Sequence, residues 1–356
     1  MATQNTNKLL QIILFFIFAS YCQISLAMEN LFYIPRCQDT GQIQPALISL
    51  QKNYKAIHIL VPQAYQVDAK GLVWGCVTPS IMNFAKAHNI KIMPMITNSG
   101  FNKLKTHKFL TDSHAQDLAI QFIVNICKQN QYYGVQFDFE MIGLSHRAAL
   151  TRFYQKAAAA LHKNGYKISI AVAPVVAEFF KESAFLQRAF DSWQGAYDLA
   201  VLGHIADFIS VMAYNQHVEG TTPGPIATAP WVEAVIKNML RYIPAAKFSL
   251  GIATYSDYWY MGRASSHSSA VRLKTKDVTY HEVEKLLQQY HLALQWDPVS
   301  QVHYAIYQRH WLNEFIYVAD AASFKSVYDL AKKYHLRGIS VFTLGWEDPK
   351  IWGVLS

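Results

Sequence analysis

Cysteine is scarce in this 356-residue chain, which contains only four. Cys22 lies in the N-terminal apolar segment, and the three that remain are an odd number, which excludes a complete disulfide framework. Cys37 and Cys76 each follow a predicted early strand and could pair, whereas Cys127 lies in a helical pattern and is expected to be a buried free thiol. No cysteines or histidines have zinc-ligand spacing, so the sequence predicts neither a metal site nor a cofactor.

Clusters of like charge are also missing. Lys and Arg outnumber Asp and Glu by 32 to 24, a net charge of +8, but the basic residues form no dense run and no nucleic-acid-binding motif appears. Charged residues make up 16% of the chain and hydrophobic residues 52%, with no low-complexity linker and no internal repeat. This composition is typical of a globular protein and excludes a disordered chain or a membrane bundle. No nucleic-acid partner is expected.

Only the N-terminus contains a long apolar run. Lys8 precedes LLQIILFFIFASY, and SLA then ends on a small residue before Met28, which is the pattern of a secretory signal peptide. Polar residues interrupt the run, so an uncleaved membrane anchor is the less favoured alternative. We therefore expect a signal peptide at residues 1–27 and a mature chain, 28–356, that is secreted or periplasmic, not bound to membrane and monomeric.

Strand-like and helix-like segments alternate along the mature chain. Strands are expected at residues 30–35, 56–64, 91–98, 132–143, 167–174, 207–215, 247–255 and 338–345. Helices are expected at residues 79–87, 113–129, 146–164, 197–205, 231–240 and 323–334. Strands that alternate with helices indicate parallel βαβ units, and eight such units predict an α/β fold of the closed (β/α)₈ TIM-barrel type.

One interval is too long for a simple connection. Between the seventh strand and the last helix, residues at about 257–322 contain HYAIYQ and EFIYVA, in which aromatic and polar residues alternate. This alternation predicts a hairpin, and a structureless loop of this length would be unusual. We expect a small α+β insertion that forms one wall of a groove.

The stretch YYGVQFDFEMIG places Gln136, Asp138 and Glu140 at every second position, between apolar residues. In an exposed antiparallel strand this would be an ordinary polar face. In a parallel barrel, however, the apolar residues pack against helices, and the polar column stands inside the barrel and rises to the carboxyl-terminal rim, where active sites lie. Because buried carboxylates are costly unless they are paired or used, Asp138 and Glu140 are candidate catalytic residues.

These motifs resemble glycoside hydrolase family 18, the chitinase-like family, over essentially the whole mature chain. The family signature D-G-x-D-x-D-x-E on the fourth strand is kept at Asp138 and Glu140, with Gln136 in the place of the second Asp. MAYN at 212–215 resembles the sixth-strand M-x-Y-D, SLGIATY the seventh strand, and GISVF the eighth, with Phe342 in the tryptophan place. MAYNQHVEGTTPGPIATAPWVEAVI is similar to a bacterial branch that includes spore-cortex and other cell-wall lytic enzymes.

The resemblance implies a glycosidase of the chitinase or N-acetylglucosaminidase type. It would cleave β-1,4 linkages next to N-acetylglucosamine in chitin, chitooligosaccharides or peptidoglycan, with the substrate's acetamido group as the nucleophile and with retention of configuration. Glu140 would then be the acid, Asp138 would hold the acetamido N–H, and Tyr214 would donate to the acetamido oxygen. The alternatives are a catalytically weak lectin on the same fold, which the two carboxylates argue against, and a secreted structural or inhibitor protein.

Five further residues are expected to bind substrate or line its site: Gln136, Met212, Asn215, Tyr255 and Phe342. Gln136 cannot ionise, so the like-charge coupling of a second Asp is absent, but its amide can donate a hydrogen bond to Asp138. Asn215 replaces a charged residue of the family pattern near the sugar. Phe342 offers less ring area than tryptophan for stacking under a sugar and has no N–H donor.

Overall fold

The computed structural model describes residues 28–36, 40–177, 183–263, 271–309 and 311–356. The predicted signal peptide and Cys37 lie outside these residues, so neither the cleavage site nor a Cys37–Cys76 pair is tested. Cys127 is buried and unpaired, as predicted, and burial raises the pKa of its thiol to about 12. Across the described ranges, no helix is both long and apolar enough to cross a membrane.

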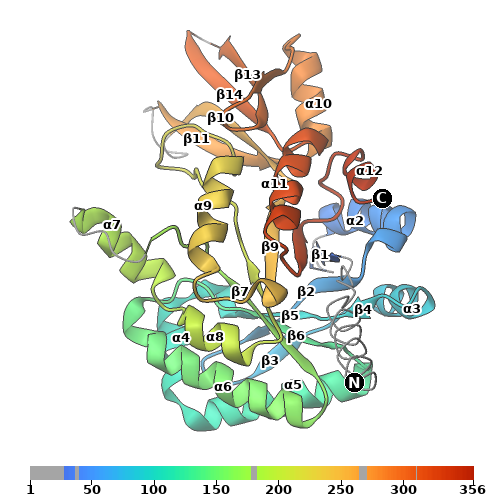
Figure 1. The fold of residues 1–356 in the computed structure, drawn as a ribbon, viewed down its shortest axis with the longest axis vertical. Helices are drawn as coiled ribbons and strands as arrows, with labels where there is room; N and C mark the ends of the chain where they lie inside the picture. Colours follow the sequence, from blue (N-terminus) through green and yellow to red (C-terminus); the bar gives the residue numbers. More distant parts are fainter. Residues whose placement is uncertain (1–27, 37–39, 178–182, 264–270, 310) are drawn as a thin grey trace, which may run out of the picture.

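The predicted TIM barrel is confirmed (Figure 1). Its strand positions are β1 (Glu29–Ile34), β2 (Ile59–Val67), β4 (Lys91–Ile92) with β5 (Met95–Asn98), β6 (Gly134–Asp138), β7 (Lys167–Val172), β8 (Phe208–Val211), β9 (Phe248–Ala253) and β15 (Gly338–Phe342). The barrel closes because β1 pairs in parallel with both β2 and β15. A short strand, β3 (Val73–Gly75), pairs antiparallel with the end of β2 and extends it.

The third strand position differs from the sequence prediction. One strand was expected over 91–98, but the structure has two short strands separated by Met93 and Pro94. Proline has no N–H to give to a ladder and so interrupts the pairing. The Pro94 carbonyl still accepts a hydrogen bond from the Gln136 N–H (3.1 Å), which keeps β5 beside β6.

Helices surround the barrel (Figure 1). They are α2 (Thr40–Asn53), α3 (Pro79–Ala87), α4 (Lys103–Thr111), α5 (Ser113–Asn130), α6 (Arg147–Lys163), α7 (Ala184–Ala189), α8 (Leu199–Ile205), α9 (Ala229–Met239), α11 (Ala321–Lys333) and α12 (Ile351–Val354). The six predicted helices are present. Helices α2 and α4 were not expected, because Pro45 lies inside α2 and the segment KLKTHKFLT of α4 has no clear apolar stripe.

The outer face of β6 packs against helices, as predicted. Phe137 and Phe139 are fully buried, and their rings contact Phe153 and Tyr154 of α6. The Phe139 and Phe153 rings are stacked at 6° with centroids 5.5 Å apart. This aromatic cluster fixes the orientation of β6, so the alternate residues Gln136 and Asp138 must point into the barrel.

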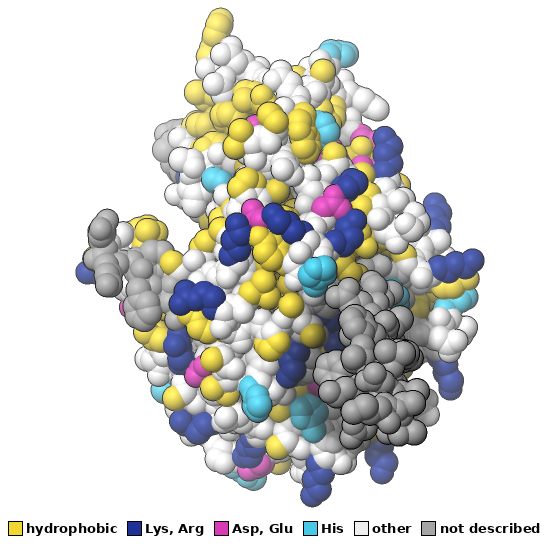
Figure 2. Space-filling model, in the orientation of Figure 1, with side chains coloured by type: hydrophobic (Ala, Val, Ile, Leu, Met, Phe, Trp, Pro, Cys, Tyr) yellow, Lys and Arg dark blue, Asp and Glu magenta, His cyan; other side chains and the backbone are white. Residues whose placement is uncertain are grey.

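The predicted insertion is a five-stranded antiparallel sheet with one helix, at the top of Figure 1. It consists of β10 (Ser256–Arg263), β11 (Val271–Val278), α10 (Tyr280–Gln289), β12 (Gln295–Asp297), β13 (Val302–Arg309) and β14 (Leu312–Val318). The hairpin expected from HYAIYQ and EFIYVA is β13–β14. Figure 2 shows hydrophobic side chains gathered over the insertion, whereas Lys and Arg are spread over this face of the molecule.

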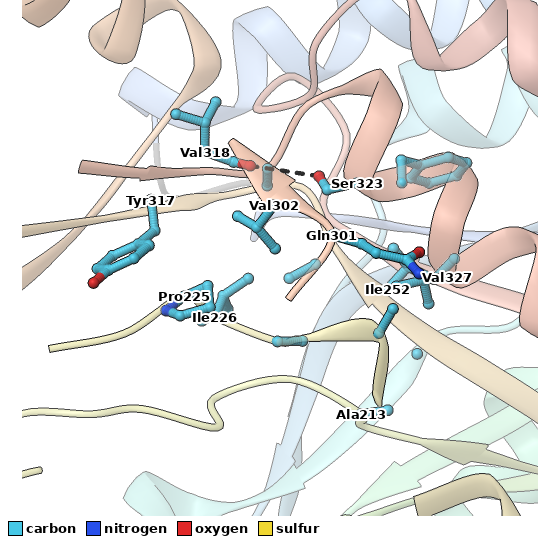
Figure 3. A pocket seen from close by; sticks show the side chains of 16 residues that line it. Ala213, Pro225, Ile226, Ile252, Gln301, Val302, Tyr317, Val318, Ser323 and Val327 are labelled. Carbon is cyan, nitrogen blue, oxygen red and sulfur yellow. Dashed lines mark hydrogen bonds between the residues drawn. The ribbon is translucent and has the colours of Figure 1, made fainter. Parts of the chain in front are cut away.

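The insertion packs against the barrel through apolar side chains. A cavity of about 30 Å³ lies between them, with Ile252 of β9 and Val327 of α11 on one side and Val302 and Tyr317 of the insertion on the other (Figure 3). The Ser323 hydroxyl donates to the Val318 carbonyl (3.4 Å) across the end of β14. The barrel and the insertion therefore face each other through side chains that line this small cavity from both sides.

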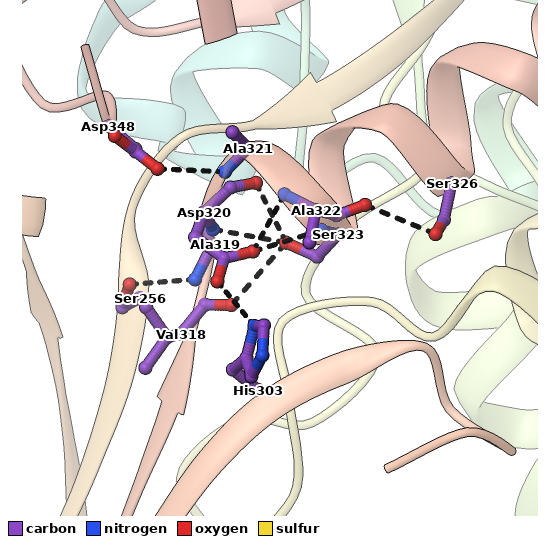
Figure 4. Close-up of polar contacts among 10 residues, drawn as sticks. All are labelled: Ser256, His303, Val318, Ala319, Asp320, Ala321, Ala322, Ser323, Ser326 and Asp348. Carbon is purple, nitrogen blue, oxygen red and sulfur yellow. Dashed lines mark hydrogen bonds and ion pairs between the residues drawn. The ribbon is translucent and has the colours of Figure 1, made fainter. Parts of the chain in front are cut away.

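Asp320 joins the end of the insertion to the start of α11 (Figure 4). Its carboxylate accepts hydrogen bonds from the Ala322 and Ser323 N–H groups (3.1 and 3.0 Å) and is hydrogen-bonded to His303 Nδ1 of β13 (2.6 Å). The first N–H of α11, that of Ala321, donates to the Asp348 carboxylate (3.0 Å). One buried side chain thus caps the helix and fixes the insertion to it.

Asp320→Ala is expected to lower the free energy of unfolding by about 2 kcal/mol, because it removes a helix cap and a partly buried hydrogen bond to His303 together. Asp320→Asn keeps an oxygen acceptor for the cap and should lose less than half as much. Urea unfolding followed by circular dichroism measures both. Equal losses for the two variants would contradict the capping role.

Candidate active site

The polar column of β6 ends in a cavity at the carboxyl-terminal rim of the barrel. Asp138 is the last residue of β6, and Glu140 follows just beyond the strand. Both line a cavity of about 380 Å³. All the site residues expected from the sequence except Gln136 line it: Asp138, Glu140, Met212, Tyr214, Asn215, Tyr255 and Phe342. The structure therefore brings together residues that lie at, or just beyond, the carboxyl ends of β6, β8, β9 and β15.

The backbone that carries Glu140 is held by two residues that the sequence did not reveal. Asn98, at the end of β5, accepts from the Glu140 N–H (3.0 Å) and donates to the Glu140 carbonyl (2.9 Å). The Tyr197 hydroxyl donates to the Phe139 carbonyl (2.8 Å). Because β6 has already ended, these three bonds replace strand pairing and keep the Glu140 side chain directed at the cavity.

Asp138 and Glu140 form a carboxyl pair that retains a proton. Burial, the Glu140 charge and a hydrogen bond with Glu140 raise the pKa of Asp138 well above its ordinary value, against a smaller lowering by Arg36. Burial also raises the pKa of Glu140, and the hydrogen bond from Asp138 partly opposes that rise. Since two adjacent buried carboxyl groups cannot both ionise easily, the pair keeps one proton to a higher pH than a lone carboxyl group would.

Gln136 lies one layer below the cavity rather than in its wall. It is fully buried, and its amide N–H groups donate to the Ser169 and Ser210 hydroxyls (both 2.9 Å). The expected donation to Asp138 is therefore wrong, because both amide hydrogens are already used. Ser210, Ser340 and Ser249 continue this network with oxygen–oxygen distances of 2.8 and 2.6 Å. The layer supports the site from beneath.

Aromatic side chains form the opposite wall. Tyr214 is 8% exposed, and burial raises the pKa of its phenol, so it stays a neutral hydrogen-bond donor. Its ring lies against Tyr255 and Phe342, with centroids 6.3 and 6.1 Å away. The Tyr255 hydroxyl donates to Asn215 Oδ1 (2.7 Å), and Asn215 adopts a left-handed φ of 61°, which asparagine tolerates well. Trp346, which the sequence analysis did not single out, packs edge-on against Tyr255.

A second acid pair lies beside this wall, at the base of the insertion. Asp257 of β10 and Asp277 of β11 are direct cross-strand neighbours, and Asp277 lines the cavity. Asp257 is 1% exposed, and its Oδ2 has no hydrogen-bond partner. Burial, together with the Asp277 charge, raises the pKa of Asp257 to about 8. Within the described residues, no group of three or more His, Cys, Asp or Glu side chains could hold a metal ion.

Asp257→Asn is expected to remove a pH-dependent loss of stability. The pKa of Asp257 is higher in the folded chain than in the unfolded chain. The free energy of unfolding of the native protein therefore falls as pH rises from about 4 to about 8, by about 6 kcal/mol in total. An amide does not ionise, so the variant gains relative stability over this range. Denaturant unfolding at pH 5 and pH 8.5 checks this; parallel pH curves for the two proteins would refute it.

A closed parallel barrel with paired carboxyl groups at its carboxyl-terminal rim is the arrangement expected of a (β/α)₈ hydrolase, the class to which many glycosidases belong. Within that class the chain belongs to family 18 of the glycosyl hydrolases, because the family model "Glycosyl hydrolases family 18" matches residues 16–347.

Two of its relatives come from Bacillus subtilis. The chain is 26% identical over 301 residues to the cortical fragment-lytic enzyme of this organism, a match that covers 82% of this chain and 66% of that enzyme. It is 23% identical over 310 residues to the uncharacterized glycosylase YvbX, covering 85% of each.

Solved structures share the fold. The Bacillus megaterium spore cortex-lytic enzyme SleL superposes with a TM-score of 0.79 at 22% identity, over 92% of this chain and 73% of that one. A chitinase from Chromobacterium violaceum gives 0.78 at 22% identity, over 92% and 98%. These similarities establish the barrel with its insertion.

Proposed function

We propose that this family 18 glycosyl hydrolase cleaves β-1,4 linkages next to N-acetylglucosamine, in chitin, chitooligosaccharides or peptidoglycan, by a retaining, substrate-assisted mechanism. The observation that carries the proposal is the Asp138–Glu140 pair, two residues apart at the end of β6 and both lining the cavity. Two carboxyl groups placed in this way lie on the same side of a bound sugar. They cannot flank a glycosidic bond as the two separated carboxylates of other glycosidases do.

The first step uses Glu140 as the acid. For this step the proton that the pair shares lies on Glu140, while Asp138 is the carboxylate. Glu140 transfers the proton to the leaving glycosidic oxygen as that bond breaks. The acetamido carbonyl oxygen of the same sugar attacks the anomeric carbon and forms an oxazolinium ion. Asp138 and Tyr214 both line the cavity; Asp138 accepts the acetamido N–H, and Tyr214 donates to the acetamido oxygen.

In the second step, water replaces the acetamido oxygen. Glu140, now a carboxylate, removes a proton from the water as it attacks the anomeric carbon, and the acetamido group is restored. Two displacements at the same carbon leave its configuration unchanged. The proton that Glu140 gave in the first step is thereby regained.

The test is to incubate the mature protein with chitooligosaccharides and with purified cell-wall sacculi and to follow new reducing ends. We expect hydrolysis of at least one substrate, and proton NMR of the fresh product should show the β-anomer first. Binding of either glycan without cleavage would favour the lectin alternative. An α-anomer as first product would exclude the substrate-assisted mechanism.

A further inference from the structure

A cation follows directly after a residue of the cavity wall and belongs neither to the carboxyl pair nor to the aromatic wall. Arg36 follows Pro35, which lines the cavity, at the carboxyl end of β1. Its side chain is half-buried. With the Gln66 amide oxygen facing Arg36, both terminal guanidinium nitrogens donate to it, at 2.8 and 3.1 Å. A neutral amide thus holds the guanidinium in a fixed position.

Strand register places this cation at the level of the carboxyl pair. Gln66 of β2 is in register with Thr97 of β5, and Thr97 is in register with Asp138 of β6. Two strand spacings separate Gln66 from Asp138, which is about 10 Å. The positive charge of Arg36 is felt at Asp138, where it lowers the pKa of the carboxyl against the larger effect of burial. Because Gln66 holds Arg36, the guanidinium lies on this side of the barrel, close enough for its charge to act on Asp138.

Arg36 has no anionic partner within the described part of the chain, whose ion pairs all involve other residues. A carboxylate or phosphate partner would stabilise a partly buried guanidinium group, because a charged group is costly to remove from water alone. The remaining N–H donors of its planar fork suit a carboxylate that arrives with a ligand. Trp74, the cross-strand neighbour of Gln66, is 41% exposed beside this position.

We propose that Arg36 binds a carboxylate carried by the substrate glycan on a sugar next to the cleaved linkage. This inference rests on the proposed hydrolysis at N-acetylglucosamine and narrows its substrate class. Chitin is neutral, whereas in peptidoglycan every second sugar carries a lactyl ether whose carboxyl group is either free or joined to a peptide that ends in a carboxylate. Arg36 thus selects the acidic glycan over the neutral one.

Binding to four matched tetrasaccharides tests the proposal in the Glu140→Gln background, where the ligand is not consumed. Three probes alternate N-acetylglucosamine with N-acetylmuramic acid. Its lactyl carboxyl group is free in the first, a methyl ester in the second, and in the third joined by an amide bond to L-alanine, whose own carboxylate is free (the alanine amide). The fourth probe is chitotetraose. Titration calorimetry gives each Kd. Arg36→Gln should raise the Kd for the free acid or the alanine amide about 10- to 100-fold, the expected effect of a lost charge-assisted bidentate contact. The ester and chitotetraose should change less than threefold.

Controls separate this contact from other effects of Arg36. Any influence of Arg36 through Asp138 acts on all four ligands and cancels in the ratio of their Kd values. Arg36→Lys keeps the charge without the fork and should give an intermediate loss for the acids. Arg152→Gln removes the same charge from the exposed side of α6 and should change nothing. Thermal unfolding verifies that each variant is folded.

Two outcomes overturn the proposal: an equal loss for all four ligands in Arg36→Gln, or equal affinity of the unmutated site for acid and ester. Dependence on Arg36 with either the free acid or the alanine amide supports it and shows which carboxylate is bound. Hydrolysis by the unmutated chain is measured separately. Absent turnover would count against the proposed function, while a carboxylate-dependent Kd would still establish the Arg36 site.

Discussion

Glu140→Gln is expected to lower kcat about 10²- to 10⁴-fold, the usual contribution of a positioned general acid. Glutamine has the same shape as glutamate but no acidic proton for the glycosidic oxygen, and it cannot activate water afterwards. The Glu140 backbone is held by Asn98 and not by its own side chain, so the loop should keep its position. Initial rates on chitotetraose and on solubilised sacculi measure the effect.

A matched control distinguishes loss of chemistry from loss of charge. Glu284→Gln removes the same carboxylate from α10, where the side chain is 52% exposed, and should leave kcat unchanged. Glu140→Gln should bind oligosaccharide with a Kd within a few-fold of the KM of the unmutated chain. Retention of more than one tenth of the native kcat would rule out Glu140 as the acid.

Asp138→Asn and Asp138→Ala should each lower kcat about 10²- to 10³-fold, comparable to the loss of one group that stabilises transition-state charge. The carboxylate of Asp138 can balance the positive charge that develops on the acetamido group as the oxazolinium forms. Neither an amide nor a methyl group carries a negative charge, so both variants lose this stabilisation. Single-turnover rates on a fluorogenic chitobioside report the step directly.

The pH profile tells the two Asp138 variants apart. The hydrogen bond from Asp138 lowers the pKa of Glu140, while burial raises it. The amide introduced by Asp138→Asn would still offer an N–H donor, whereas the methyl group introduced by Asp138→Ala would offer none, so the pKa of Glu140 should rise further in Asp138→Ala. Since activity is lost as Glu140 deprotonates, the alkaline limb of kcat/KM should move to higher pH in Asp138→Ala and much less in Asp138→Asn. Identical profiles would contradict direct coupling of the pair.

Local sequence patterns predicted the parts of the fold that depend on one face of one element. The alternation from Val135 to Glu140 indicated a strand with one apolar face, and that face is buried against α6. The hairpin of the insertion followed from alternation in the same way. These predictions succeeded because burial of an apolar face is set by residues two or four apart in the chain.

Features that depend on long-range contacts could not be predicted in this way. Asn98 and Tyr197 hold the backbone around Glu140, but they lie 42 and 58 residues from the positions they bond. Gln136 was expected to donate to Asp138, yet serines on β7 and β8 are within reach of its amide and take both hydrogens. Nothing near these residues in the sequence indicates the partner.

The sequence by itself determined that eight strands would alternate with helices and that one of these strands would carry two carboxylates on its polar face. It also determined that the motifs are those of family 18. Only the tertiary structure decided the layer at which each polar side chain lies and which of them share a proton. It also showed that Arg36, held by Gln66, has no anionic partner among the described residues. The physical reason is that periodicity fixes the direction of a side chain along its own element. Charge and hydrogen bonding depend instead on neighbours that barrel closure brings from distant segments.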